Sequence, residues 1–142
     1  MIKVIYLAGP IHHVTPEQAT GWRRKVTAKL EPLGYEILDP TAGKDLYQPG
    51  VNTTVFTPEH IVETDIKMID SADMLIVDIS HLVPCWGTAM EMRHAWSRGK
   101  TILTWGEANI ESYWIRYHAT ETHFSLAGVI HKLKREAGVW KE

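Results

Sequence analysis

Two short and almost wholly apolar segments constrain the fold of this chain more than any other feature. They are KVIYLAG at residues 3–9, which ends at Gly9-Pro10, and DMLIVDI at residues 73–79. Apolar runs of this length without alternation are typical of strands that are buried on both faces of a parallel sheet. We therefore expect two buried parallel strands, one in each segment.

Helical patterns and further strand-like segments alternate along the rest of the chain. Apolar residues at three- and four-residue steps follow Thr15-Pro16, and a second helical pattern follows Thr57-Pro58. Both openings are typical of helix starts. The expected elements are strands at 3–9, 35–38, 73–79, 101–105 and within 113–119, and helices at about 15–31, 57–72, 84–96 and 125–138.

This order of elements predicts a single α/β domain over residues 1–142. Five strands that alternate with helices, without repeats or low-complexity linkers, indicate an open parallel sheet with helices on both faces. The length suits a five-stranded, flavodoxin-like or Rossmann-like three-layer sandwich. In that winding the first and third strands are neighbours, and their carboxyl ends frame the ligand crevice. The loops AGPIHH and DISHLVPCWGTAME therefore hold the candidate site.

Composition argues against several classes of partner and site. The formal charge of −2 offers no general attraction to nucleic acids or anionic membranes. The amino-terminal apolar run is too short for a signal peptide, and one cysteine cannot form an internal disulfide, so a cytoplasmic protein is expected. The eight histidines lack the spacing of a helix-borne zinc pair, and the first loop lacks the glycines of a dinucleotide site. We expect neither a metal nor a cofactor.

Glu91, near the start of the helix in PCWGTAMEMRHAW, has two interpretations. Thr88-Ala89-Met90-Glu91 fits a capping box, and spacing alone favours that structural role over catalysis. However, Gly87 would let the backbone approach a ligand, and a helix amino terminus stabilises an ionised carboxylate. Both interpretations place Glu91 at the crevice.

Two aspartates are further candidates, each with a structural alternative. Asp65 follows Glu63 in VETDIKMID, and we assign Glu63 rather than Asp65 to the solvated face of that helix. Asp78 ends the third strand, where a carboxylate is suited to bonding the N–H groups of the following loop. The apolar residues that mark the buried side of the Asp65 helix are Ile61, Ile66 and Ile69.

Aromatic residues supply the remaining candidates. Tyr6 lies in an apolar strand and shares a face with Ala8, so its hydroxyl either reaches toward the crevice or bonds a main-chain carbonyl in the core. Trp22 and Trp86 either stack on a planar base or serve in packing. Residues 41–57 form a connection long enough to serve as a lid.

Three blocks of the sequence resemble the nucleoside 2-deoxyribosyltransferase family, in register over most of the chain. They are IYLAGPI, VETDIKMIDSADMLIVDIS and WGTAMEMRHAWSRGKTI. The resemblance implies that Glu91 is the nucleophile, that Asp65 handles the proton of the leaving base, and that Tyr6 orients the nucleophile. It also implies a homo-oligomer in which neighbouring subunits complete each site.

The activity that the resemblance implies is cleavage of the N-glycosidic bond of a 2'-deoxynucleoside or its 5'-monophosphate through a covalent deoxyribosyl-Glu91 intermediate. Transfer to a second nucleobase is the first expectation. A 2'-deoxynucleoside 5'-monophosphate N-glycosidase, with water as acceptor, is an alternative, and a non-catalytic nucleotide-binding sensor is another. The expected partners are a small deoxynucleoside or deoxynucleotide and a free nucleobase.

One position departs from the family pattern. Six residues before the nucleophile, the transferases carry an aspartate that holds the sugar 5'-hydroxyl and the N-glycosidases carry a serine, whereas this chain has Cys85. Losing an anionic group removes a repulsion against a phosphate. Residues in or near loops that could contact that phosphate are His12, His13, Arg23 and Ser80. The full candidate set for substrate binding is Gly9, Pro10, Trp22, Asp78, Ser80, Cys85, Trp86 and Gly87.

Overall fold

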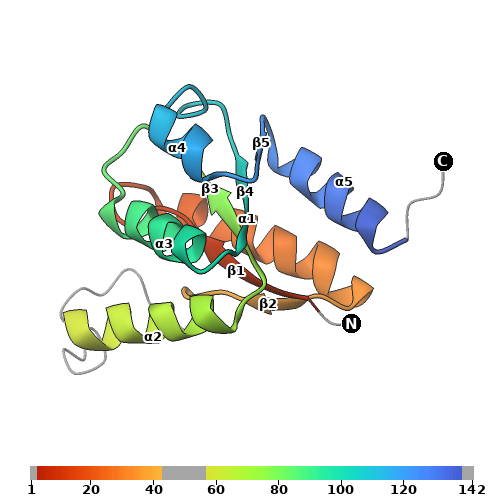
Figure 1. Ribbon diagram of the computed structural model, residues 1–142, viewed down its shortest axis with the longest axis horizontal. Helices are drawn as coiled ribbons and strands as arrows, with labels where there is room; N and C mark the ends of the chain where they lie inside the picture. Colours follow the sequence, from red (N-terminus) through yellow and green to blue (C-terminus); the bar gives the residue numbers. More distant parts are fainter. Residues whose placement is uncertain (1–2, 43–56, 139–142) are drawn as a thin grey trace.

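The computed structural model describes residues 3–42 and 57–138 and contains a five-stranded parallel sheet with helices on both faces (Figure 1). The strand order is β2-β1-β3-β4-β5, and all neighbouring strands are parallel. This is the flavodoxin-like winding that the sequence predicts. Most of the predicted lid lies outside the described residues. The strands are β1 (Val4–Ala8), β2 (Glu36–Leu38), β3 (Met74–Asp78), β4 (Thr101–Trp105) and β5 (Glu121–His123).

The helices begin where local cap chemistry predicts. The side chains of Thr15 and Thr57 accept hydrogen bonds from the backbone N–H groups of Gln18 and His60, and a proline follows each threonine. No helix in the described part of the chain combines the length and apolar character needed to cross a membrane. The helices are α1 (Pro16–Leu30), a short 3-10 turn (Glu31–Leu33), α2 (Pro58–Ser71), α3 (Trp86–Ser97), α4 (Tyr113–His118) and α5 (Leu126–Glu136).

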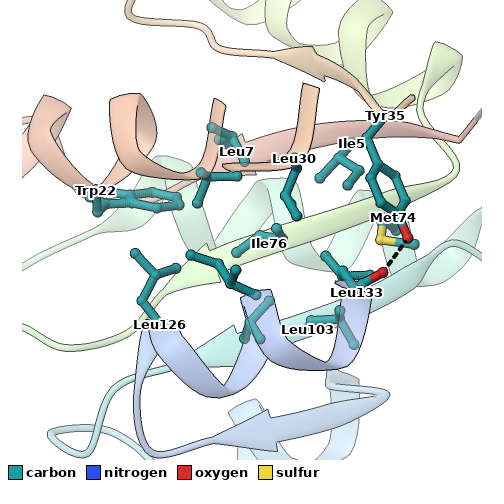
Figure 2. Close-up of a cluster of buried hydrophobic side chains, with 13 residues drawn as sticks. Ile5, Leu7, Trp22, Leu30, Tyr35, Met74, Ile76, Leu103, Leu126 and Leu133 are labelled. Carbon is teal, nitrogen blue, oxygen red and sulfur yellow. Dashed lines mark hydrogen bonds between the residues drawn. The ribbon is translucent and has the colours of Figure 1, made fainter. Parts of the chain in front are cut away.

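The two faces of the sheet bury separate cores. Helices α1 and α5 cover one face, and α2 and α3 cover the other (Figure 1). Ile5 and Leu7 belong to the first core, which Figure 2 shows, whereas Tyr6 belongs to the second. In the first core, the hydroxyl of Tyr35 donates a hydrogen bond to the carbonyl of Leu133 at 2.8 Å. The alternation along β1 therefore turns Tyr6 toward the helices that carry the candidate carboxylates.

The strand predicted within 113–119 is wrong, because this segment forms α4 and β5 follows it. Ser112 caps the helix by accepting a hydrogen bond from the N–H of Ile115. His118 is buried three residues after the partly buried Ile115, and this spacing is that of a helix. The aromatic and β-branched composition favours a strand, but the cap and the period of the inward side chains decide otherwise.

Candidate active site

The carboxyl ends of β1 and β3 lie side by side, as expected for the switch point of this winding. Gly9 follows β1 at this edge. A Cβ atom at Gly9 would lie 2.9 Å from the Cβ of Asp78 and 3.1 Å from Cζ2 of Trp22. The loop after β1 can therefore pack against the end of β3 only because residue 9 has no side chain.

Tyr6 and Glu91 form the central interaction of the site. The hydroxyl of Tyr6 on β1 donates a hydrogen bond to Oε2 of Glu91 on α3. Tyr6 has no exposed surface, and its burial raises the pKa of the phenol, which the charge of Glu91 raises further. The phenol therefore stays protonated and remains a donor to the carboxylate. Of the two partners considered for the Tyr6 hydroxyl, the structure shows the acid rather than a main-chain carbonyl.

Asp65 on α2 lies close to the same pair. Its negative charge also raises the pKa of Tyr6, so the carboxylate acts on the phenol from a second helix. One oxygen of Asp65 is buried, whereas Glu63 is exposed, as we assigned from the sequence. Tyr6, Asp65 and Glu91 thus come from three separate elements to one face of the sheet.

The capping box predicted at Thr88 does not form. Helix α3 begins at Trp86, and Cys85 at its cap makes no side-chain hydrogen bond to the helix. Thr88 is buried inside the first turn, and Glu91 lies in the second turn with a partner on β1. The field of the helix terminus falls off within the first turn, so the predicted stabilisation of Glu91 by the helix amino terminus is small.

Asp78 bonds the loop that follows β3, which is the structural alternative considered for it from the sequence. Its Oδ1 accepts hydrogen bonds from the N–H of Ser80 at 2.8 Å and from the Ser80 hydroxyl at 2.5 Å. The Nε2 of His81 lies 3.6 Å from Oδ2, a distance too long for a direct hydrogen bond. Asp78 and Ser80 therefore bind each other and shape the loop between β3 and α3.

The start of α3 is open to solvent. Trp86 is 77% exposed, and a Cβ atom at Gly87 would meet no other described atom within 4 Å. Cys85 is partly buried, and its burial, followed by the charge of Asp78, raises the pKa of the thiol. A neutral thiol therefore stands at the position where the resemblance implies an aspartate or a serine.

Trp22 does not contribute a free face for a base. It is 7% exposed, and its ring lies 5.5 Å from that of Trp105, centroid to centroid, in the core under α1 and α5. Of the two roles considered for Trp22, the structure therefore shows packing rather than stacking on a base. The physical reason is its position on the inward stripe of α1, which also contains Ala19, Val26 and Leu30.

Arg23, which we considered as a possible phosphate contact, lies inside the protein. Its guanidinium is fully buried, so it cannot contact a phosphate in this conformation. Nη2 donates to the carbonyl of Gly9 at 3.1 Å instead. The sequence does carry a sign of this burial: Arg23 follows Ala19 by four residues, and this spacing puts both side chains on the inward side of α1.

An open cavity of about 610 Å³ lies at the same end of the sheet. It shares Ser80 with the candidate set but is not lined by Tyr6, Asp65 or Glu91. Its lining residues are Ser80, Trp105, Gly106, Glu107, Ala108, Phe124, Ser125 and Leu126.

The acidic side chains do not form a metal site in the described part of the chain, where no three His, Cys, Asp or Glu residues are grouped as ligands for one ion. Glu91 is instead held by a phenol.

Comparison with known proteins decides the family. A family model described as nucleoside 2-deoxyribosyltransferase matches residues 5–126. The chain belongs to the nucleoside 2-deoxyribosyltransferase family. The matched region runs from β1 to the start of α5, so Tyr6, Asp65 and Glu91 all lie within it. The resemblance recognised in the sequence is thereby confirmed.

Individual relatives match the chain in sequence or in structure. A protein from Thermofilum pendens that is named for 2'-deoxynucleoside 5'-phosphate N-hydrolase activity is 27% identical over 99 residues, which are 70% of this chain and 64% of the relative. The chain thus spans less than two thirds of that relative's length. A deoxyribosyltransferase from Leishmania mexicana is 30% identical, with a TM-score of 0.53, over 72% of this chain and 63% of the other.

A third structural match extends over almost the whole length of both chains. The structure of a 2-deoxyribosyltransferase from Bacillus psychrosaccharolyticus matches 92% of this chain and 95% of its own, with a TM-score of 0.66 and 21% identity. At that identity the match shows a shared fold, and it confirms the predicted α/β class.

Proposed function

We propose that this protein cleaves the N-glycosidic bond of a 2'-deoxynucleoside, or of its 5'-monophosphate, and transfers the deoxyribosyl group to a second nucleobase. The observation that carries the proposal is the hydrogen bond to Glu91 from Tyr6, a buried phenol with a raised pKa, with Asp65 beside the pair. Helix capping does not account for this arrangement, because α3 begins five residues earlier and Glu91 bonds to another element.

In the first half of the reaction, a carboxylate oxygen of Glu91 attacks C1' of the sugar. The C1'–O bond forms as the C1'–N bond breaks, through a state with oxocarbenium character. Tyr6 holds Oε2, which orients the carboxylate for attack. Asp65, which takes up a proton from solvent before the bond breaks, gives that proton to the departing base, and the electron pair of the broken bond leaves on the base nitrogen.

In the second half, a new base attacks C1' of the deoxyribosyl-Glu91 ester. Ionised Asp65 takes the proton of the incoming base, and the electron pair of the C1'–O bond returns to Glu91. Two displacements at the same carbon give overall retention of configuration. Water in place of the base would give hydrolysis by the same steps.

Hydrolysis of a 5'-monophosphate is the second candidate, and two observations favour it. The relative from Thermofilum pendens is named for that activity. In addition, Cys85 is a thiol whose pKa is raised, so it presents no negative charge to a phosphate where the transferases have an aspartate. A sensor without turnover is disfavoured because the Tyr6–Glu91 pair has no evident use in it.

We also propose that the protein works as a homo-oligomer whose contact surface includes α4. Tyr113, Trp114 and Tyr117 are 82%, 78% and 63% exposed. At about 200 Å² for each buried aromatic side chain, they would bury roughly 450 Å², about half of what one partner contributes to a standard interface. Monomeric proteins seldom expose so many neighbouring aromatic rings, so a second copy is the proposed cover.

A chromatographic assay tests the proposed activity. The protein is incubated with each 2'-deoxynucleoside and each 5'-monophosphate, with and without a second free base, beside Glu91→Gln. A new deoxynucleoside that forms only with the second base establishes transfer, and free base from monophosphates alone establishes the hydrolase. No product from any substrate, together with saturable nucleotide binding, would replace the enzyme with the sensor.

A further inference from the structure

A side chain from a distant loop holds the connection between β3 and α3. Asn109 lies between β4 and α4, and its Nδ2 donates hydrogen bonds to the main-chain carbonyls of Ile79 at 2.8 Å and of His81 at 2.9 Å. Because both acceptors are carbonyl oxygens, the amide nitrogen rather than the amide oxygen must face them. Both N–H groups of one amide therefore bind the loop after β3.

The main chains of the two loops also meet. The N–H of Ile79 donates to the carbonyl of Trp105 at 3.0 Å. Gly106 has a φ of 117°, and a Cβ atom there would lie 2.6 Å from Cα of Ser80. Glycine tolerates both this backbone conformation and this close approach. The segment after β4 therefore supports the first residues of the loop after β3.

The rest of that loop is a short and stiff connection to α3. Leu82, Val83 and Pro84 lead from His81 to Cys85, which is the cap residue of α3. A proline fixes its own φ and restricts the residue before it. A displacement at His81 is therefore transmitted to Cys85 and to the start of the helix.

The nucleophile proposed for the reaction is held from a different element. Glu91 accepts its hydrogen bond from Tyr6 on β1, whereas Asn109 binds carbonyls of the loop before α3. Loss of the Asn109 amide therefore leaves the Tyr6–Glu91 bond in place. We expect such a loss to change how substrate is bound more than how fast the bound substrate reacts.

We propose that Asn109 is a positioning residue for substrate binding: its amide holds residues 79–81 so that Cys85 keeps its place at the crevice. The consequence for substrate rests on the proposed function, in which residue 85 lies at the 5' end of the sugar. Asn109 acts through the main chain of the loop rather than through a contact with substrate. Its hold on the loop exists apart from any reaction and can be measured without turnover.

The first test measures the loop without substrate. Amide hydrogen exchange is followed by NMR in the unsubstituted protein, in Asn109→Ala and in Glu107→Ala, which removes an exposed side chain from the same segment. The reporters are the N–H groups of Ile79 and Ser80, which are hydrogen-bonded in the structure. Both should exchange about tenfold faster in Asn109→Ala and at an unchanged rate in Glu107→Ala. Unchanged exchange in folded Asn109→Ala would overturn the proposal.

A second variant covers the case in which Asn109→Ala does not fold. Asn109→Ser keeps one donor at this position in place of two. It should increase the exchange of Ile79 and Ser80 by a smaller factor, and no increase would overturn the proposal.

The second test separates KM from kcat. In Asn109→Ala we expect KM to rise about five- to tenfold and kcat to stay within about twofold, because the Tyr6–Glu91 bond is retained. A fall in kcat with an unchanged KM would indicate a merely structural role and would overturn the proposal. Glu107→Ala should change neither constant.

A substrate without a 5' group shows where the effect acts. For a 2',5'-dideoxynucleoside with the same base, KM should be the same in Asn109→Ala and in the unsubstituted protein. An equal rise for both substrates would overturn the assignment to the 5' end. If the unsubstituted protein shows no turnover, the proposed function fails, but hydrogen exchange at Ile79 and Ser80 still decides whether Asn109 holds the loop.

Discussion

The hydroxyl of Tyr6, inside β1, donates a hydrogen bond to Oε2 of Glu91 in the second turn of α3. The bond joins the sheet to the helix that covers it, and it brings a carboxylate to the carboxyl ends of β1 and β3. The phenol has a raised pKa because it is buried and lies beside Glu91 and Asp65. Tyr6 is thus a donor to Glu91 at neutral pH.

Replacement of Glu91 by glutamine is expected to abolish turnover with little change in stability. The amide can still accept from Tyr6, but it cannot form a stable ester with C1', so kcat should fall by at least about 10³-fold. An assay for released free base checks the loss of turnover, and a thermal melt checks the stability. Glu63→Gln, an exposed carboxylate on α2, is the matched control and should stay active. Full activity in Glu91→Gln would refute the nucleophile assignment.

Replacement of Tyr6 by phenylalanine should reduce kcat by roughly 10–100-fold and leave KM nearly unchanged. The ring continues to fill the core, but Glu91 loses the donor that orients it. Stability should change by no more than about 1–2 kcal/mol, the usual effect of one hydrogen bond. Steady-state kinetics and urea unfolding supply both numbers. A loss confined to KM would show that the hydroxyl serves substrate binding instead.

Alkaline pH should destabilise the protein partly through Tyr6. Its pKa is raised in the folded state from 10.0, so the folded protein retains a proton that the unfolded chain releases. The stability from this group is full below pH 10 and declines as pH rises toward the folded pKa, by up to about 1.4 kcal/mol per pH unit. Urea unfolding between neutral pH and pH 11 checks the decline, which should be shallower in Tyr6→Phe. Equal slopes would mean that Tyr6 ionises in the folded protein.

Replacement of Asp65 by asparagine should slow departure of the base by about 10²–10⁴-fold. The asparagine amide has no acidic proton to donate. A 2-deoxyribosyl substrate with a leaving group that needs no protonation should therefore be cleaved almost normally by this variant. Single-turnover kinetics with both substrates provide the comparison. If both substrates slow equally, Asp65 positions groups in the site rather than donating a proton.

Substitution on α4 should change the state of association. Trp114→Asp places a charge among exposed aromatic rings, which should shift the protein to a smaller species in analytical ultracentrifugation. Phe124→Asp is the control, because Phe124 is 71% exposed but lies after β5. A monomer at every concentration of the unsubstituted protein would reject the proposed interface.

Local sequence patterns determined most of the scaffold. The apolar runs of β1 and β3 and the threonine-proline starts of α1 and α2 depend on neighbouring residues alone, so periodicity and cap chemistry predict them. The alternation of strands and helices then leads to the winding and to the edge of the sheet that holds the site. The single domain, the cytoplasmic location and the individual roles of the site residues stay predictions.

Tertiary structure decided the rest, because the deciding partners are far apart in the chain. Which side chains face inward decides both α4 and the first turn of α3. Composition predicted a strand in 113–119, and spacing predicted a capping box at Thr88, and neither forms. The partner of Tyr6 is 85 residues away, and the burial of Arg23 depends on a carbonyl in another element. A sequence shows which groups a chain carries, whereas only the packed fold sets the distances and burial that give those groups their charge and orientation.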